Sequence, residues 1–270
     1  MSVLIDADRW EELLEHRTGV FLGARSGHVA SAVKRRMAQH GIDSDEAYWE
    51  LLHGPDAGLE WSMLVDELVV KDTRFFRHRA SFEFVRSHIL KRLAANSAMR
   101  DYAIWSLGCS TGEEAWSLAM VANDCSKDSD GQMRYSVLGT DVSIRAVSEC
   151  RKGVYGAQQL AQMTPDERTL YFSQVGRHRR VVDELRSRVA FNVGNVIELS
   201  SEGLKYDLIF CQNLLVYFRK WRRRRVLDAM VSRLKPEGLL IIGPGEMTKW
   251  NHPLLEYVGQ GEVAAYQKIK

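Results

Sequence analysis

The chain has 270 residues, 45% of them hydrophobic and 27% charged, and its 37 basic and 35 acidic residues leave a formal net charge of only +2. This composition is typical of a globular protein and disfavours a nucleic-acid-binding domain, which would carry a larger basic excess. The longest apolar runs are far shorter than the roughly 18 residues of a membrane-spanning helix, and the acidic N-terminus does not predict a secretory signal.

The first 75 residues are predicted to form a small helical domain. Apolar side chains recur there at intervals that place them on one face of a helix, as at Trp61, Leu64, Val65 and Leu68. A shorter version of the pattern surrounds Trp10, and glycines separate the helical segments. The alternation of apolar and polar residues that marks a half-buried strand is not found in this part of the sequence.

From residue 76 to residue 270 the pattern predicts an α/β domain. Short apolar runs alternate with helical stretches, and the runs cover residues 103–107, 135–138, 189–193, 207–211 and 239–242. Alternation of this kind predicts βαβ units and a mostly parallel sheet. Residues 169–193 depart from it, because they contain a succession of short strand-like segments with a turn at Gly176. We expect them to form a small antiparallel insertion.

The first strand-to-helix turn of this domain indicates a ligand site. Gly108 and Gly112 flank the turn, and Glu113 and Glu114 open the next helix. Nucleotide-like ligands bind at this edge of an open α/β sheet. The glycine pattern is not the G-x-G-x-x-G that favours NAD, and acids at a helix start repel phosphate but suit an ammonium and a sulfonium. This favours S-adenosylmethionine (AdoMet), unless both glutamates only offset the helix dipole.

Polar residues also follow the second and fourth predicted strands. Asp141 can accept hydrogen bonds from both hydroxyls of a ribose, although it could instead cap the next helix. Asn213 follows a buried strand and is either a turn residue or a ligand contact. Tyr217 either faces the same crevice or packs in the core.

Four segments occur in an order and spacing that are specific together. They are Thr73-Arg-Phe-Phe-Arg77, the Gly-Cys-Ser-Thr-Gly-Glu-Glu turn from Gly108, Gly139-Thr-Asp141 with the later Gly153-Val-Tyr155, and Phe210-Cys-Gln-Asn-Leu-Leu-Val-Tyr217. In these segments the chain resembles the CheR-type chemotaxis receptor methyltransferases, which methylate receptor glutamates with AdoMet. The resemblance covers about residues 70–246 and implies a Rossmann-like class I AdoMet methyltransferase sheet.

The resemblance also implies roles for individual residues. Glu113 would hold the methionyl ammonium of AdoMet, Asp141 the ribose, and Asn195 would lie by the adenine. The positions that match the family's cofactor-binding residues are Thr73, Arg77, Gly108, Glu113, Asp141, Asn195, Val196, Asn213 and Leu214, and those that match its catalytic residues are Arg77 and Tyr217.

The implied reaction needs no catalytic triad, carboxylate pair or metal. The four cysteines are scattered and form no C-x-x-C pair, so the sequence predicts no zinc site. A glutamate side chain in water has a pKa of about 4.3, so it is ionised at neutral pH and can attack the sulfonium methyl directly. The protein has to align the reactants and exclude water, and S-adenosylhomocysteine (AdoHcy) is the product. We expect Arg77 to orient the acceptor carboxylate.

Two positions depart from the family pattern. Lys71 stands where the family usually has asparagine, which would alter a polar contact near the cofactor. Gly243-Pro-Gly-Glu246 stands where the family usually has Gly-His-Ser-Glu, so the role of that loop is left open.

The implied partners are the cytoplasmic methylation helices of chemoreceptors, and we expect a cytoplasmic monomer that inserts into no membrane and binds no nucleic acid. The basic triplet Lys34–Arg36 would steer acidic receptor helices, or it is a plain exposed face. The basic run Arg219–Arg225 is predicted as a solvated helix face, with nucleic acid as the alternative. The turn around Gly176 is short and crowded with basic residues, so we expect no tethering pentapeptide.

Two other functions stay open at this point. One is a catalytically silent AdoMet-binding regulatory module of a chemosensory or pilus-motility pathway. The other is an NAD-dependent dehydrogenase, against which the glycine pattern of the first turn argues.

Overall fold

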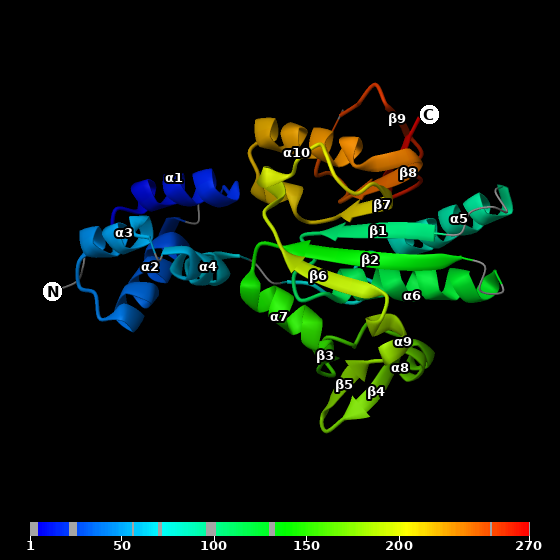
Figure 1. Ribbon diagram of the computed structural model, residues 1–270, viewed down its shortest axis with the longest axis horizontal. Coiled ribbons are helices and arrows are strands. Elements are labelled where there is room, and N and C mark those ends of the chain that lie inside the picture. Colours follow the sequence, from blue (N-terminus) through cyan, green and yellow to red (C-terminus); the bar gives the residue numbers. More distant parts are fainter. Residues whose placement is uncertain are drawn as a thin grey trace.

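The computed structural model describes residues 5–21, 26–55, 57–69, 72–95, 101–129, 133–248 and 250–269. Lys71, one of the two departures from the family pattern, lies outside these ranges. The described chain forms a helical lobe followed by an α/β domain (Figure 1). Within it, no helix combines the length and the hydropathy needed to cross a bilayer.

The lobe consists of four helices with a hydrophobic core of their own. They are α1 (Ala7–Thr18), α2 (Ser26–His40), α3 (Asp45–His53) and α4 (Ala57–Leu68). The core includes Trp10, Val33 and Leu64, each fully buried. The side chains of Asp6 and Ser44 accept hydrogen bonds from backbone N–H groups in the first turns of α1 and α3, which explains where these helices begin. The predicted boundary at residue 75 falls between α4 and α5.

A buried ionic cluster joins three of these helices. Glu60 of α4 accepts hydrogen bonds from Nε of Arg36 (2.8 Å), from the Tyr48 hydroxyl (2.6 Å) and from Nε2 of His40 (2.7 Å). Burial opposes ionisation of Glu60, but these hydrogen bonds outweigh it and lower its pKa to about 2. Arg36 is therefore not part of an exposed basic face, and of the triplet Lys34–Arg36 only the first two side chains reach solvent.

The α/β domain is built on a seven-stranded sheet in the order β6-β2-β1-β7-β8-β10-β9. Its strands are β1 (Asp101–Leu107), β2 (Arg134–Asp141), β6 (Val189–Val193), β7 (Tyr206–Cys211), β8 (Leu234–Ile242), β9 (Leu255–Tyr257) and β10 (Ala264–Lys268). The first five strands of the order pair in parallel, whereas β10 is antiparallel to both of its neighbours. This sheet confirms the predicted fold class.

Helices cover both faces of the sheet (Figure 1). On one face, α5 (Arg79–Ala95), α6 (Glu113–Asp128) and α7 (Ile144–Lys152) contribute to one hydrophobic core. On the other, α10 (Lys220–Ser232) packs through Val226, Leu227 and Met230. β7 is buried along its whole length between the two layers, so the sequence shows it as a continuous apolar run.

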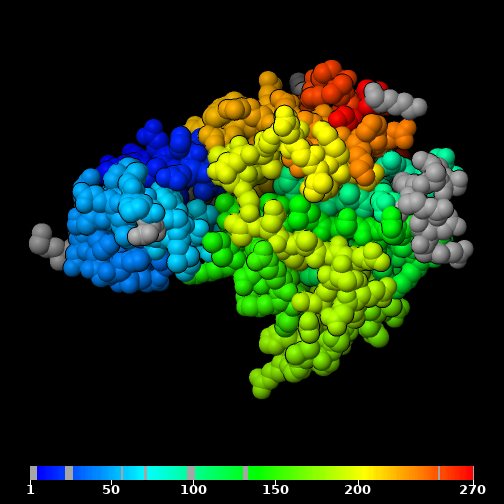
Figure 2. Space-filling model, viewed as in Figure 1, coloured from blue at the N-terminus to red at the C-terminus, as the bar shows by residue number. Residues whose placement is uncertain are grey.

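The antiparallel insertion has different bounds from those predicted. Its three strands, in the order β3-β5-β4, are β3 (Val154–Tyr155), β4 (Phe172–Val175) and β5 (His178–Val181). Residues 169–171 belong instead to a helix, α8 (Pro165–Tyr171), because Thr164 and Glu167 form a capping box at its start. Residues 183–186 form the short helix α9 (Asp183–Arg186), and β6 pairs with β2 in the main sheet. In Figure 2 the hairpin of β4 and β5 projects from the body.

Candidate functional site

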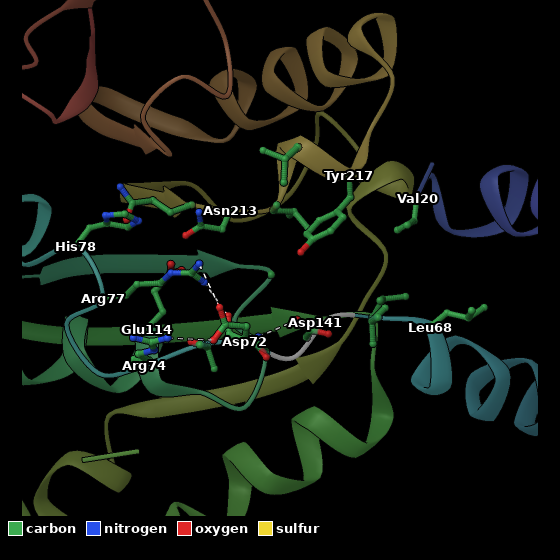
Figure 3. Close-up of a pocket in the computed structure, with 18 of the residues that line it drawn as sticks. Val20, Leu68, Asp72, Arg74, Arg77, His78, Glu114, Asp141, Asn213 and Tyr217 are labelled. Carbon is green, nitrogen blue, oxygen red and sulfur yellow. Dashed lines mark hydrogen bonds and ion pairs between the residues drawn. The ribbon is translucent and has the colours of Figure 1, made fainter. Parts of the chain in front are cut away.

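A cavity of about 280 Å³ lies where the carboxyl ends of β1, β2 and β7 meet the helical lobe. Figure 3 shows side chains from the sheet domain, from the lobe and from the segment between them directed into it. The predicted site residues that line it are Thr73, Arg77, Gly108, Asp141, Asn213, Leu214 and Tyr217. The cavity is next to β1, where the strand order of the sheet reverses. Open α/β sheets bind nucleotide-like ligands at this point.

The turn after β1 forms the floor of the cavity and depends on glycine. Gly108 has a φ of +74°, and a Cβ added there would lie 3.1 Å from the side chain of Leu214, another residue that lines the cavity. The backbone N–H groups of Gly108 and Cys109 both donate to the carbonyl of Thr140 at the end of β2. The first two strand ends are thereby fixed to each other.

Of the two acids that open α6, the structure places Glu114 at the cavity and Glu113 outside its lining. Glu113 is 1% exposed, and its carboxylate accepts from Thr111 Oγ1 (2.7 Å) and from Gln159 Nε2 (3.1 Å), away from the cavity. Its neighbour Glu114 lines the cavity and accepts from the Ser106 hydroxyl (2.7 Å). Burial raises the pKa of Glu114 well above its usual value. Consecutive helical residues point in different directions, and here only Glu114 of the pair lines the cavity.

Asp141 is a cavity residue and not a helix cap. Its carboxylate accepts from the backbone N–H of Ser110 (2.8 Å) and of Ser143 (2.9 Å). The N-cap of α7 is Ser143, whose hydroxyl accepts from the N–H of Ala146. Asp141 therefore joins the turn after β1 to the start of α7 while it faces the cavity, the position expected of a ribose ligand.

The Thr73–Arg77 segment enters the cavity from the side of the lobe. Phe75 is fully buried and packs edge-on against Tyr155 and Phe172, so the segment is anchored to the sheet domain. Arg77 Nη1 donates to the carbonyl of Asp72 (2.7 Å), and Nη2 lies 3.5 Å from the Asp72 carboxylate. The guanidinium is thus held at the cavity edge with part of its surface open to a ligand.

The structure does not bring Asn195 and Val196 to this cavity. The Asn195 side-chain amide donates to the carbonyl of Arg17 at the end of α1 (2.7 Å), and its oxygen accepts from the N–H of Ile197. Val196 is buried in the core under α10. Asn195 therefore joins the lobe to the sheet domain in this structure.

Several lining residues were not predicted from the sequence, notably His78, Ser110 and Gln212, and Glu114 was singled out only together with Glu113. Nε2 of His78 and the hydroxyl of Ser110 are buried, and neither has a hydrogen-bond partner within the described part of the chain. Unsatisfied polar atoms that line a cavity indicate a polar ligand. Together with the carboxylates of Glu114 and Asp141, they suit the ammonium and ribose of AdoMet.

Comparison with known proteins gives a family and named relatives. Residues 71–263 match the CheR methyltransferase SAM-binding domain family. The chain is 31% identical over 93% of its length to a Pseudomonas aeruginosa protein named "Probable biofilm formation methyltransferase WspC", of which it spans 59%. It is 29% identical to the chemotaxis protein methyltransferase Cher2 of Pseudomonas putida, over 90% of each chain. It is 30% identical to the Escherichia coli chemotaxis protein methyltransferase, over 88% of this chain and 82% of that one.

Proposed function

The chain belongs to the CheR methyltransferase family, and we propose that it transfers the methyl group of AdoMet to glutamate side chains on the cytoplasmic helices of chemoreceptors. The products are glutamate methyl esters and AdoHcy. One observation carries the proposal: a single cavity joins two acids suited to AdoMet with the segments that hold Arg77 and Tyr217.

The position of each lining residue suggests which part of the two reactants it contacts. Glu114 in the first turn of α6 would hold the methionyl ammonium, and Asp141 at the end of β2 would hold the ribose. AdoMet supplies an activated methyl on its sulfonium. The acceptor carboxylate is already a nucleophile, so the protein has to exclude water and align the two reactants. Arg77 is positioned to orient that carboxylate, and its hold must stay loose enough to leave an oxygen lone pair for the methyl.

A silent regulatory module is the weaker candidate. Such a module would need the acids that hold the cofactor but not a guanidinium and a phenol beside them. Arg77 and Tyr217 line the same cavity here. The chemotaxis relatives are themselves named methyltransferases.

For the finer details of the partner, we propose a cytoplasmic monomer that reaches its receptor without a pentapeptide tether. The turn between β4 and β5 consists of Gly176 and Arg177 alone, and the following residues of β5 are His178, Arg179 and Arg180. A peptide strand needs accessible backbone to pair with, and bulky side chains obstruct it. Lys34 and Arg35 are the exposed remainder of the candidate steering face on α2.

The test is methyl transfer from labelled AdoMet to purified receptor cytoplasmic fragments, followed by release of the label in base. Glutamate methyl esters are base-labile, so the expected result is volatile label that depends on receptor glutamates. Receptor fragments with those glutamates changed to alanine serve as the control. Tight AdoMet binding without any transfer would favour the silent module, and binding of NAD in place of AdoMet would refute both.

A further inference from the structure

The wall of the cavity formed by residues 212–217 is held from behind by a buried carboxylate. Glu246 follows β8 and is 3% exposed. Its carboxylate accepts from the backbone N–H of Gly243 (2.7 Å) and of Val216 (3.4 Å). Burial raises its pKa, and hydrogen bonds from the backbone of Gly243, Val216, Asn213 and Leu215 oppose that rise. The Glu246 carboxylate thus accepts backbone N–H hydrogen bonds from the loop after β7 and from the loop after β8.

A guanidinium holds the carbonyl groups of the same two loops. Arg223 of α10 donates through Nε to Phe218 O (2.8 Å), through Nη1 to Glu246 O (2.9 Å) and through Nη2 to Val216 O (3.3 Å). It is one of the basic residues in the run Arg219–Arg225, and it is directed inward. The peptide groups around Val216 are therefore held by a carboxylate on the N–H side and a guanidinium on the C=O side.

The loop needs such support because its conformation is unfavourable by itself. Asn213 has a φ of +61°, in the left-handed region that costs a non-glycine residue free energy. A Cβ at residue 243 would lie 2.5 Å from Oε2 of Glu246, so a glycine there lets the carboxylate approach. Strained residues persist at functional sites only where their surroundings over-determine them.

We propose that Glu246 and Arg223 are positioning residues, which hold Asn213 and Tyr217 in the arrangement that binds the cofactor and aligns methyl transfer. They act on the peptide groups of the loop, and neither side chain lines the cavity. This role extends the proposed function and rests on it for the transfer step. It also gives a function to the loop Gly243–Glu246, whose sequence departs from the family pattern.

A double-mutant cycle on AdoHcy affinity tests the proposal. Calorimetry would compare the wild type, Glu246→Gln, Asn213→Ala and the double variant. If Glu246 acts through Asn213, each single substitution is expected to lower the AdoHcy affinity about tenfold. The affinity of the double variant should then lie within about threefold of that of the weaker-binding single variant. Losses that multiply to about a hundredfold would show independent effects and overturn the proposal. Unchanged affinity in Glu246→Gln would overturn it equally.

Matched controls separate positioning from general stability. Glu237→Gln changes an exposed glutamate of β8, and Arg224→Lys changes the exposed neighbour of Arg223, so both should keep wild-type affinity. Should Glu246→Gln fail to melt cooperatively, Arg223→Lys takes its place in the cycle with the same expected result. Methyl transfer is measured in parallel. A wild type that binds AdoHcy but transfers no methyl refutes the proposed function, while the binding cycle still decides the role of Glu246.

Discussion

At the scale of single residues, the proposed role of Glu114 in binding the methionyl ammonium depends on its protonation. Its burial favours the neutral carboxylic acid, the nearby Glu246 adds to this, and Arg77 opposes it. A bound ammonium would stabilise the carboxylate, so binding and loss of the proton are linked. Burial also raises the pKa of Glu113, but its carboxylate accepts from Thr111 and Gln159 and does not line the cavity.

Glu114→Gln is expected to weaken AdoMet and AdoHcy binding by roughly 1.5–3 kcal/mol, the cost of losing a charge-assisted hydrogen bond. In the wild type, affinity should rise with pH through the raised pKa of Glu114, because the ionised form binds the ammonium. In Glu114→Gln that rise should be absent. Calorimetry across the neutral range measures both effects. Glu113→Gln is the control. If it lowers the affinity for AdoMet and AdoHcy more than Glu114→Gln does, Glu113 and not Glu114 binds the ammonium.

Arg77→Ala is expected to lower turnover far more than AdoMet affinity. The guanidinium lies at the cavity edge, tied to Asp72, where it can orient an acceptor carboxylate. Single-turnover methylation at saturating AdoMet isolates this step from binding. Arg77→Lys keeps the charge but loses the planar fork, so an intermediate rate is expected. A wild-type rate of methyl transfer in Arg77→Ala would show that Arg77 has no role in the reaction.

At the scale of secondary-structure elements, the contact between α4 and α7 connects the lobe to the end of β2 that carries Asp141, the proposed ribose ligand. Asp66 of α4 has a fully buried side chain, which accepts hydrogen bonds from the Ser143 hydroxyl and the N–H of Arg145 (3.3 Å). The N–H of Ser143 in turn donates to Asp141. A residue of the helical lobe therefore fixes the backbone that hydrogen-bonds to Asp141, the proposed ribose ligand.

Asp66→Ala is expected to weaken AdoHcy binding severalfold, because Ser143 would lose the partner that orients it toward Asp141. Glu67→Ala is the matched control, since the neighbouring Glu67 pairs with Arg35 and Arg145 but with no residue of the Asp141–Ser143 segment. Calorimetry with both variants, alongside their melting temperatures, checks this. Equal affinities in the two variants would show that the lobe does not govern the ribose end.

The elements that the sequence predicts well are those with a strong pattern. Continuous apolar runs identify β1 and β7, and the helical face of Trp61–Leu68 identifies α4. The insertion is harder because its strands are short and the capping box of α8 competes with strand-like residues at 169–171. Glu113 and Asn195 were predicted as cofactor contacts, yet neither lines the cavity, because the direction of a side chain depends on tertiary neighbours that sequence spacing does not give.

At the scale of the whole molecule, the helical lobe and the β4–β5 hairpin lie on different sides of the sheet domain (Figure 1). The hairpin is far from the lobe, and its two-residue turn offers little backbone to a peptide. Under the proposal that no tether is used, recognition of a receptor helix would depend on the region of the cavity and on the exposed charges of α2, where Arg35 already pairs with Glu67 (3.0 Å).

Receptor-tail pentapeptides are therefore expected to show no binding in a calorimetric titration. A tether would raise the local receptor concentration to about the millimolar range, and without it affinity has to come from direct contact. That affinity should fall as salt rises, because exposed charges are screened over about 8 Å at physiological ionic strength. Fragments of the receptor methylation helix serve as the positive comparison. Micromolar binding of any pentapeptide would refute the absence of a tether.

The residues that line the cavity come from segments that are far apart in the sequence, and this affects the order in which the protein folds. The lobe closes its core through helices adjacent in sequence, whereas the sheet has to bring β1 against β7 from far along the chain. Local contacts form faster than distant ones. During refolding, helical signal should thus recover before the capacity to bind AdoHcy. A newly made chain would therefore acquire its affinity for the cofactor only after β7 has been synthesised and paired with β1, which is later than the lobe can form.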